Sequence, residues 1–274
     1  MEYENTQLGI PKSTEKLVKY QNILLILPVL LIILAELLLF SGNMQYSIWV
    51  HVFVLIGLAL ATVYTGDTYL FKPYQALMLL PLLRLVNISM PIFFDMTLYL
   101  YIFIYTPLII PVYIIAVHQG FTFEQLGFTF KYWKLIIPVS VIVGFAIALG
   151  EHYIIHAGTL IADLSFLNVL KLSIVMIIFI GLIEELIFRS ILQTRMEESM
   201  GMFSGLVVTS ILFGVLHSGY GTFYEMFFTS LAGLLMGYMF QKTRSLPLIT
   251  VTHGTVNIFL FGVIPLMGPT LGLI

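Results

Sequence analysis

The chain has 274 residues, of which 59% are hydrophobic and only 9% are Asp, Glu, Lys or Arg. A soluble domain is about one quarter charged, so this composition excludes a soluble enzyme and predicts an integral membrane protein. The net charge of −2 offers no basic surface for nucleic acid, and the absence of cysteine excludes disulfides, thiolate metal ligands and a cysteine nucleophile. Because one spanning helix needs about 20 apolar residues, the length predicts an all-α polytopic bundle of eight to nine transmembrane helices.

Nine apolar segments are the candidates for these helices. They cover approximately residues 23–40, 48–64, 74–94, 98–117, 135–157, 170–192, 202–217, 223–240 and 248–263. The first is too long for the core of a signal peptide, so we expect it to be a retained span. The third contains Pro81, Arg84 and Pro91 and could be re-entrant instead, which leaves the count at eight or nine.

The distribution of cations predicts the orientation of the chain. With the N-terminus inside, six loop cations fall on the same side: Lys72, Lys131, Lys134, Arg195, Lys242 and Arg244. The positive-inside rule therefore predicts a cytoplasmic N-terminus. The absence of long loops favours the plasma membrane of a prokaryote.

The sixth apolar segment reads GLIEELIFRS and places three charged side chains at membrane depth. Charge is costly there, so each such residue is a candidate functional residue. Glu185 and Arg189 are spaced i,i+4 in the order that favours an ion pair on a helix. That pairing leaves Glu184 about 100° away on another face of the helix.

Two histidines fall at a similar depth in later segments. His217 follows Phe213 by four residues, and Asn257 follows His253 by four residues, so each pair shares a helix face. At about 1.5 Å per residue, Glu184, His217 and His253 lie about 15, 20 and 12 Å from the polar turns on the cytoplasmic side. The sequence therefore predicts that the three helices bring these side chains to one site.

A carboxylate, two imidazoles and a carboxamide suit the hydrolysis of an amide bond. Glu184 with His217 could deprotonate a water molecule, and His253 with Asn257 could donate hydrogen bonds to the oxyanion. One Glu and two His are also a catalytic zinc ligand set, formed here by Glu184, His217 and His253. The ligands come from three helices and no HExxH is present, so the residues alone leave the cofactor unknown, with zinc and no metal as the alternatives.

Other polar residues inside apolar segments carry weaker predictions. Glu36 and Arg84 could form an ion pair within the N-terminal bundle, a prediction that rests on the sign of their charges alone. Glu151, His152 and His156 have the spacing of metal ligands on one helix face, but we interpret them as a solvated helix end.

Two further segments have a structural interpretation. Gly233 and Gly237 form a GxxxG pair, which favours close packing of helices within the bundle ahead of homodimerisation. The aromatic-rich connection at residues 118–134 is amphipathic and favours an interfacial segment on the cytoplasmic face, with a flap at a substrate entrance as the alternative.

Three motifs in consecutive or near-consecutive segments give a more specific indication. EExxxR at residues 184–189, FxxxH at 213–217 and HxxxN at 253–257 together resemble the CPBP family of intramembrane proteases. That family includes the type II CAAX prenyl endopeptidases, or Ras-converting enzymes, and bacteriocin-processing or immunity proteins. The resemblance covers approximately residues 171–266, the last third of the chain, and all three motifs are intact and in order.

The resemblance implies a glutamate-dependent endopeptidase built as a helical bundle around a conical cavity. It implies that Glu184 and His217 activate water, that His253 and Asn257 stabilise the oxyanion, and that three residues support the site: Glu185, Arg189 and Phe213. Its partners would be the lipid bilayer and a peptide or membrane-associated protein substrate, such as a CaaX-like protein. A metal requirement and the oligomeric state stay open.

The N-terminal half extends beyond what the family core needs, with up to five spans before EExxxR. We predict an N-terminal bundle at residues 1–157 and a CPBP-like catalytic core at 158–274, joined in one integrated membrane domain. Two rival functions remain: an ion-coupled transporter that uses Glu184, Glu185 and Arg189 as a relay, and a non-catalytic bacteriocin-immunity or scaffold protein of the same fold.

Overall fold

The computed structural model describes residues 12–64, 68–93 and 97–271, and this part of the chain contains helices and no strand. Eight of its helical segments are long and apolar enough to cross a membrane. The predicted all-α membrane bundle is therefore confirmed. Asp95, which lies near the end of the third predicted span, falls outside the described residues.

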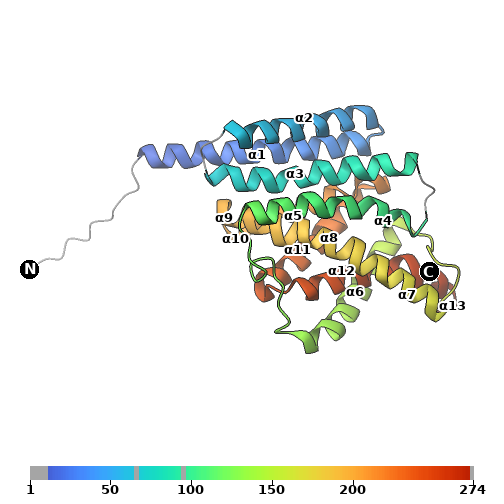
Figure 1. Cartoon of the computed structure of the whole chain (residues 1–274). Coiled ribbons are helices and arrows are strands. Elements are labelled where there is room, and N and C mark those ends of the chain that lie inside the picture. The colour runs from blue at the N-terminus through green and yellow to red at the C-terminus, as the bar shows by residue number, and fades with distance from the viewer. Residues whose placement is uncertain (1–11, 65–67, 94–96, 272–274) are drawn as a thin grey trace, which may run out of the picture.

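Three long helices form the N-terminal part of the bundle: α1 (Lys12–Phe40), α2 (Met44–Tyr64) and α3 (Thr68–Ser89). They pack against one another and run side by side (Figure 1). α3 is one continuous helix of 22 residues, about 33 Å long, although it contains Pro73 and Pro81. A continuous helix of this length is long enough to cross a membrane, and the choice between a span and a re-entrant segment stays a prediction. α3, which carries Lys72 and Arg84, comes in addition to the eight apolar segments.

The middle of the chain supplies two spans. The first consists of α4 (Leu100–Tyr105), η2 (Thr106–Leu108) and α5 (Ile109–His118), and it follows the short turn η1 (Met90–Ile92). The second is α6 (Trp133–Ile155), which packs against α11 (Phe223–Thr243) and α12 (Leu246–Ile258). The predicted boundary at residue 157, between an N-terminal bundle and a catalytic core, stays a prediction. α6 lies before this boundary and packs against C-terminal helices, so the two parts are in direct contact.

The sixth apolar segment is a single span of 35 residues, Phe166–Met200. It begins with α7 (Phe166–Ile174) and ends with α9 (Thr194–Met200). Between them, the π-helical segments η3 (Val175–Gly181) and η4 (Leu186–Gln193) flank the single turn α8 (Leu182–Glu185). Widened π-helical turns are rare and often mark functional sites, and here they bracket Glu184 and Glu185.

The C-terminal helices complete the bundle. They are α10 (Met202–Val215), η5 (Ser218–Tyr220), α11 (Phe223–Thr243), α12 (Leu246–Ile258), η6 (Phe259–Val263) and α13 (Ile264–Leu271). On α11, a Cβ atom on Gly233 would lie 3.0 Å from Phe213, and one on Gly237 would lie 2.6 Å from Leu206, so α10 packs directly over both glycines. The predicted role of the GxxxG pair in packing within the bundle is confirmed.

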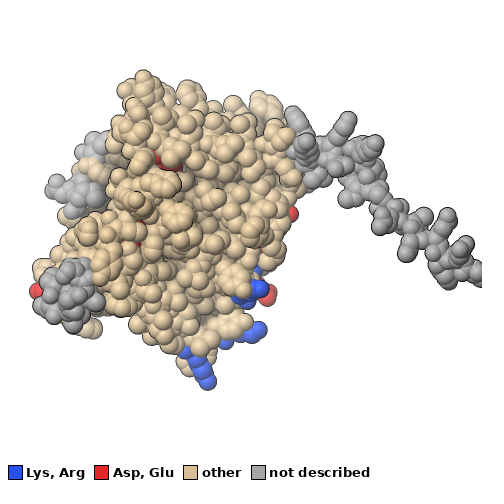
Figure 2. All heavy atoms as spheres, turned by 180° about the vertical axis from the view of Figure 1, so that it is seen from behind, with Lys and Arg blue, Asp and Glu red and all other residues tan. Residues whose placement is uncertain are grey.

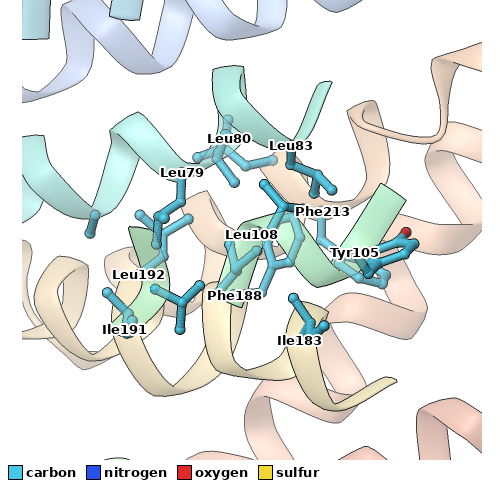
Figure 3. Packing of buried hydrophobic residues seen from close by; sticks show 14 of the residues in the cluster. Leu79, Leu80, Leu83, Tyr105, Leu108, Ile183, Phe188, Ile191, Leu192 and Phe213 are labelled. Atoms are coloured by element: carbon cyan, nitrogen blue, oxygen red, sulfur yellow. The ribbon is translucent and has the colours of Figure 1, made fainter. Parts of the chain in front are cut away.

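Apolar side chains join the two halves of the bundle. Figure 3 shows Leu79, Leu80 and Leu83 of α3 above side chains of the helix that carries Glu184, including Ile183 and Phe188. These residues belong to one buried cluster, so the N-terminal helices pack on the segment that contains the EExxxR motif.

The outer surface matches a lipid environment. Large apolar side chains are exposed along most helices, and Lys and Arg atoms gather along the lower edge of the face in Figure 2. At this end Gln119 donates to the backbone oxygen of Lys72 at 3.1 Å and accepts from Arg195 at 2.6 Å. Arg244 pairs with Glu197 at 2.9 Å. The cations predicted to share a side are thus tied together in part by direct contacts.

Candidate active site

A cavity of about 300 Å³ lies inside the bundle. Five residues from the three motifs line it: Glu184, Phe213, His217, His253 and Asn257. They come from α8, from the C-terminal end of α10 with the turn that follows it, and from α12. The structure therefore brings together the side chains that the depth estimate placed at similar levels. Glu185 and Arg189 lie behind this lining and are fully buried.

The carboxylate of Glu184 is held between α4 and α12. The hydroxyl of Tyr105 donates a hydrogen bond to Oε1 of Glu184. The other oxygen, Oε2, lies 3.7 Å from Nε2 of His253. Glu184 is 8% exposed, so its carboxylate meets the cavity and little else. One oxygen is therefore fixed by a tyrosine while the other faces the cavity and His253.

Glu185 organises the groups behind the cavity wall. Its Oε1 accepts from Nη1 of Arg189 at 3.1 Å and contacts Nδ1 of His253 at 2.7 Å. The predicted ion pair of Glu185 and Arg189 is confirmed. The guanidinium also donates to the backbone oxygen of Gly233 at 3.4 Å and lies 4.3 Å from the centre of the Phe213 ring. Because glycine has no side chain, α11 comes close enough for Arg189 to reach its backbone.

The contacts of His217 define its tautomer. Nδ1 lies 2.9 Å from the backbone oxygen of Phe213. A carbonyl oxygen only accepts hydrogen bonds, so Nδ1 carries a proton, and the neutral ring then presents Nε2 as an acceptor. The ring packs against Phe213 and is nearly parallel to that of Tyr220, with an angle of 13° between the planes. His217 can therefore accept a proton from a group in the cavity.

His253 and Asn257 lie on one face of α12. Nδ1 of His253 donates to Glu185, so a proton on Nε2 would point to Glu184 and the cavity. Asn257 also lines the cavity, and its side-chain amide makes no hydrogen bond to another residue in the described part of the chain. Its N–H groups are thus available to a molecule in the cavity.

The arrangement does not match a zinc site. A catalytic zinc needs three protein ligands about 2.0–2.2 Å from the metal. Among the described residues, no three His, Cys, Asp or Glu side chains are grouped closely enough to hold a metal ion. The set of Glu184, His217 and His253 therefore does not fit zinc in this arrangement, and the mechanism below uses protein groups alone.

Several residues of the cavity were not expected from the sequence. Its other polar lining residues are Arg84, Asn87, Tyr101, Tyr105, Glu151 and Tyr220. Tyr105 lies in an apolar run, 79 residues before Glu184, and no spacing connects the two. The same apolar stretch contains Tyr99, Tyr101 and Tyr113, and nothing in the sequence singles out Tyr105 among them.

Glu151 requires a correction. Glu151 and His152 are 6% and 3% exposed, so the interpretation of these two residues as a solvated helix end is wrong, while His156 is exposed. Their burial follows from the packing of α6 against α11 and α12, which the sequence does not reveal.

Residues 166–259 match a family model described as type II CAAX prenyl endopeptidase Rce1-like. The matched range contains all three motifs and about a third of the chain. The chain carries an Rce1-like domain. No match was found among curated proteins or solved structures.

The Rce1-like domain begins at α7 and ends at the start of η6, so α1 to α6 lie outside it. A domain of this family suggests intramembrane proteolysis. The eight candidate spans indicate that the Rce1-like domain belongs to an integral membrane protein.

Proposed function

We propose that this protein is an intramembrane glutamate-dependent endopeptidase. The observation that carries this proposal is that Glu184, His217, His253 and Asn257 line the same cavity. Around one space, these groups supply a general base, a hydrogen-bond acceptor that orients water and two hydrogen-bond donors for the oxyanion. These are the parts needed to hydrolyse a peptide bond without a covalent intermediate.

The first step is the attack of water on the peptide carbonyl carbon. Oε2 of Glu184 and Nε2 of His217 orient the water, and Glu184 removes one of its protons as the new C–O bond forms. Tyr105 holds the other carboxylate oxygen, so the base presents a fixed lone pair to the water. Because Glu184 and His253 are largely buried, these interactions are less screened than they would be in solution.

The carbonyl oxygen then becomes an oxyanion. The side-chain N–H of Asn257 and a proton on Nε2 of the doubly protonated His253 donate to it. Glu185 accepts a hydrogen bond from Nδ1 of His253 and keeps the ring oriented for this role. Collapse of the tetrahedral intermediate breaks the C–N bond, and the proton taken by Glu184 passes to the leaving amine.

The surroundings of the cavity favour a membrane-associated peptide as substrate. The lining combines Glu184 and the histidines with apolar residues such as Leu83, Ile180 and Phe261, so it suits a peptide segment presented from the bilayer. A CaaX-like protein is one candidate. We also propose that the end of the bundle rich in Lys and Arg, which includes the start of α3, faces the cytoplasm.

Cleavage by the purified protein tests this function. Unmodified and lipid-anchored peptides are incubated with protein in proteoliposomes, and products are identified by mass spectrometry. We expect Glu184→Gln to lower the cleavage rate by about 10²–10⁴-fold, the contribution of one general base. The matched control is Glu124→Gln, the same change at an exposed position. Equal cleavage by wild type and Glu184→Gln would overturn the proposal, and Glu184-dependent solute uptake would favour a transporter.

A further inference from the structure

A buried ion pair joins α1 to α3 outside the Rce1-like domain. Nε of Arg84 donates to Oε1 of Glu36 at 2.8 Å, and Nη2 donates to Oε2 at 2.7 Å. Glu36 is fully buried and Arg84 is 6% exposed. The pair predicted from charge alone is therefore confirmed, with the two-pronged geometry that fixes both side chains.

The same pair contacts the turn that carries His217, on both sides of that residue. Nη2 of Arg84 also donates to the backbone oxygen of Leu216, the residue before His217. The hydroxyl of Ser218, the residue after it, donates to Oε2 of Glu36 at 2.6 Å. His217 thus lies between two anchor points on one ion pair.

The position of the turn explains why it needs these anchors. α10 ends at Val215 and η5 begins at Ser218, so Leu216 and His217 form the connection between two helical segments. The last carbonyl groups of a helix lack partners within the helix, and Arg84 supplies one to Leu216. Without Arg84 and Glu36, the residues on both sides of His217 would lose these two hydrogen bonds to α1 and α3.

The ring of His217 depends on this backbone. Its only side-chain hydrogen bond to a described residue is the one to Phe213, within the same stretch of chain. The ring also packs against Phe213, near the end of α10, and Tyr220, in η5, both within four residues of His217 in the sequence. A shift of the turn would therefore carry the imidazole with it.

We propose that Glu36 and Arg84 are positioning residues, which hold the turn at Leu216 and Ser218 so that His217 faces the cavity opposite Glu184. This inference rests on the proposed peptidase activity. Misplacement of a reacting group by about 1 Å can lower a rate by about 10²-fold, so the anchors would act on kcat more than on substrate binding.

The test removes one anchor without changing the charge of the pair. Ser218→Ala deletes the hydroxyl that donates to Glu36. Ser210→Ala is the matched control, because Ser210 is a buried serine on α10 whose hydroxyl donates to the backbone of its own helix at Leu206, 2.7 Å away. We expect Ser218→Ala to lower kcat about 10-fold with little change in KM, and Ser210→Ala to leave both constants unchanged.

A double-mutant cycle separates positioning from general loss of structure. If Ser218 acts through His217, Ser218→Ala causes no further loss of rate in a His217→Ala background. Arg84→Lys is the second variant, because a lysine keeps the charge but cannot donate to both oxygens of Glu36 and to Leu216. We expect its kcat to fall by about 10–100-fold. A wild-type kcat in both Ser218→Ala and Arg84→Lys would overturn the proposal. So would a loss of rate from Ser218→Ala that is as large in the His217→Ala background as in the wild type.

A spectroscopic measurement distinguishes failure of the positioning proposal from failure of the peptidase proposal. In ¹⁵N-histidine-labelled protein, the His217 signals are assigned by their absence in His217→Gln. We expect Ser218→Ala to shift these signals and Ser210→Ala to leave them in place. Shifted signals in a protein that cleaves nothing would contradict the peptidase and support positioning. Unshifted signals in an active Glu184-dependent enzyme would contradict positioning alone.

Discussion

The hydroxyl of Tyr105 donates a hydrogen bond to Oε1 of Glu184, across 79 residues of sequence. Both groups are buried, and Tyr105 is 5% exposed. The contact places α4, which precedes the Rce1-like domain, in direct support of the proposed base. It leaves Oε2 of Glu184 as the oxygen that faces the cavity.

Tyr105→Phe should therefore lower kcat/KM by about 10–100-fold, since a hydrogen bond to a charged group contributes about 1.5–3 kcal/mol. The ring stays in place, so we expect the protein to fold and to bind peptide. Steady-state cleavage measures the effect. Tyr113→Phe, an exposed tyrosine in the same span, is the control. An unchanged kcat/KM in Tyr105→Phe would show that Glu184 does not need this donor.

Arg189→Ala should destabilise the protein by about 3–5 kcal/mol, because it removes a buried guanidinium that donates to both Glu185 and the backbone oxygen of Gly233. Thermal unfolding in detergent measures the loss. Arg244→Ala is the comparison. Arg244 is part-exposed, and Gln193 and Gln241 still donate to its partner Glu197, so we expect a loss of at most about 1 kcal/mol. Similar losses of stability in the two variants would contradict the expectation that Arg189 contributes more because it is buried.

Gly214→Ala should destabilise the contact of α10 with α11. A Cβ atom on Gly214 would overlap the side chain and backbone nitrogen of Ser230 and the backbone oxygen of Met226. These backbone atoms belong to α11 and cannot move independently of that helix. Overpacking of this kind costs about 1–3 kcal/mol. Gly57→Ala, in α2, is the control because a Cβ there meets no atom within 4 Å. We expect it to raise stability slightly through helix propensity. Equal unfolding temperatures for the two variants would argue against direct packing at Gly214.

Peptide cleavage should not change when the protein is incubated with a zinc chelator. The described residues contain no group of three potential ligands close enough for a metal. The assay compares rates before and after chelation and dialysis. A loss of activity that added zinc restores would require the site to rearrange around a metal.

The sequence predicted the parts of this structure that depend on composition and spacing. Apolar runs of spanning length gave the helices, and the i,i+4 spacing of Glu185 and Arg189 gave their ion pair. Counting the rise per residue brought Glu184, His217 and His253 to similar depth, because membrane helices are long and nearly straight. These predictions use local geometry only.

Contacts between distant helices could not be predicted in this way. No periodicity connects Tyr105 with Glu184, and none places Glu151 in the cavity, since both depend on how helices rotate about their axes in the bundle. The π-helical segments beside Glu184 carry no sequence signal that we can name. α3 stays helical through Pro81, although proline removes one backbone hydrogen bond of a helix and its presence made a continuous helix uncertain from the sequence.

The contacts of Arg84 with Leu216 and of Ser218 with Glu36 bear on how separable the parts of this protein are. A fragment cut at Phe166 would retain every motif residue, yet the turn at His217 would lose both outside partners. The leucines of α3 would also be missing from the surface that they cover. The boundaries of the Rce1-like domain therefore do not enclose all the contacts that hold the turn at His217. A chimera with the N-terminal helices of another membrane protein would keep these contacts only if Glu36 and Arg84 were transplanted as well.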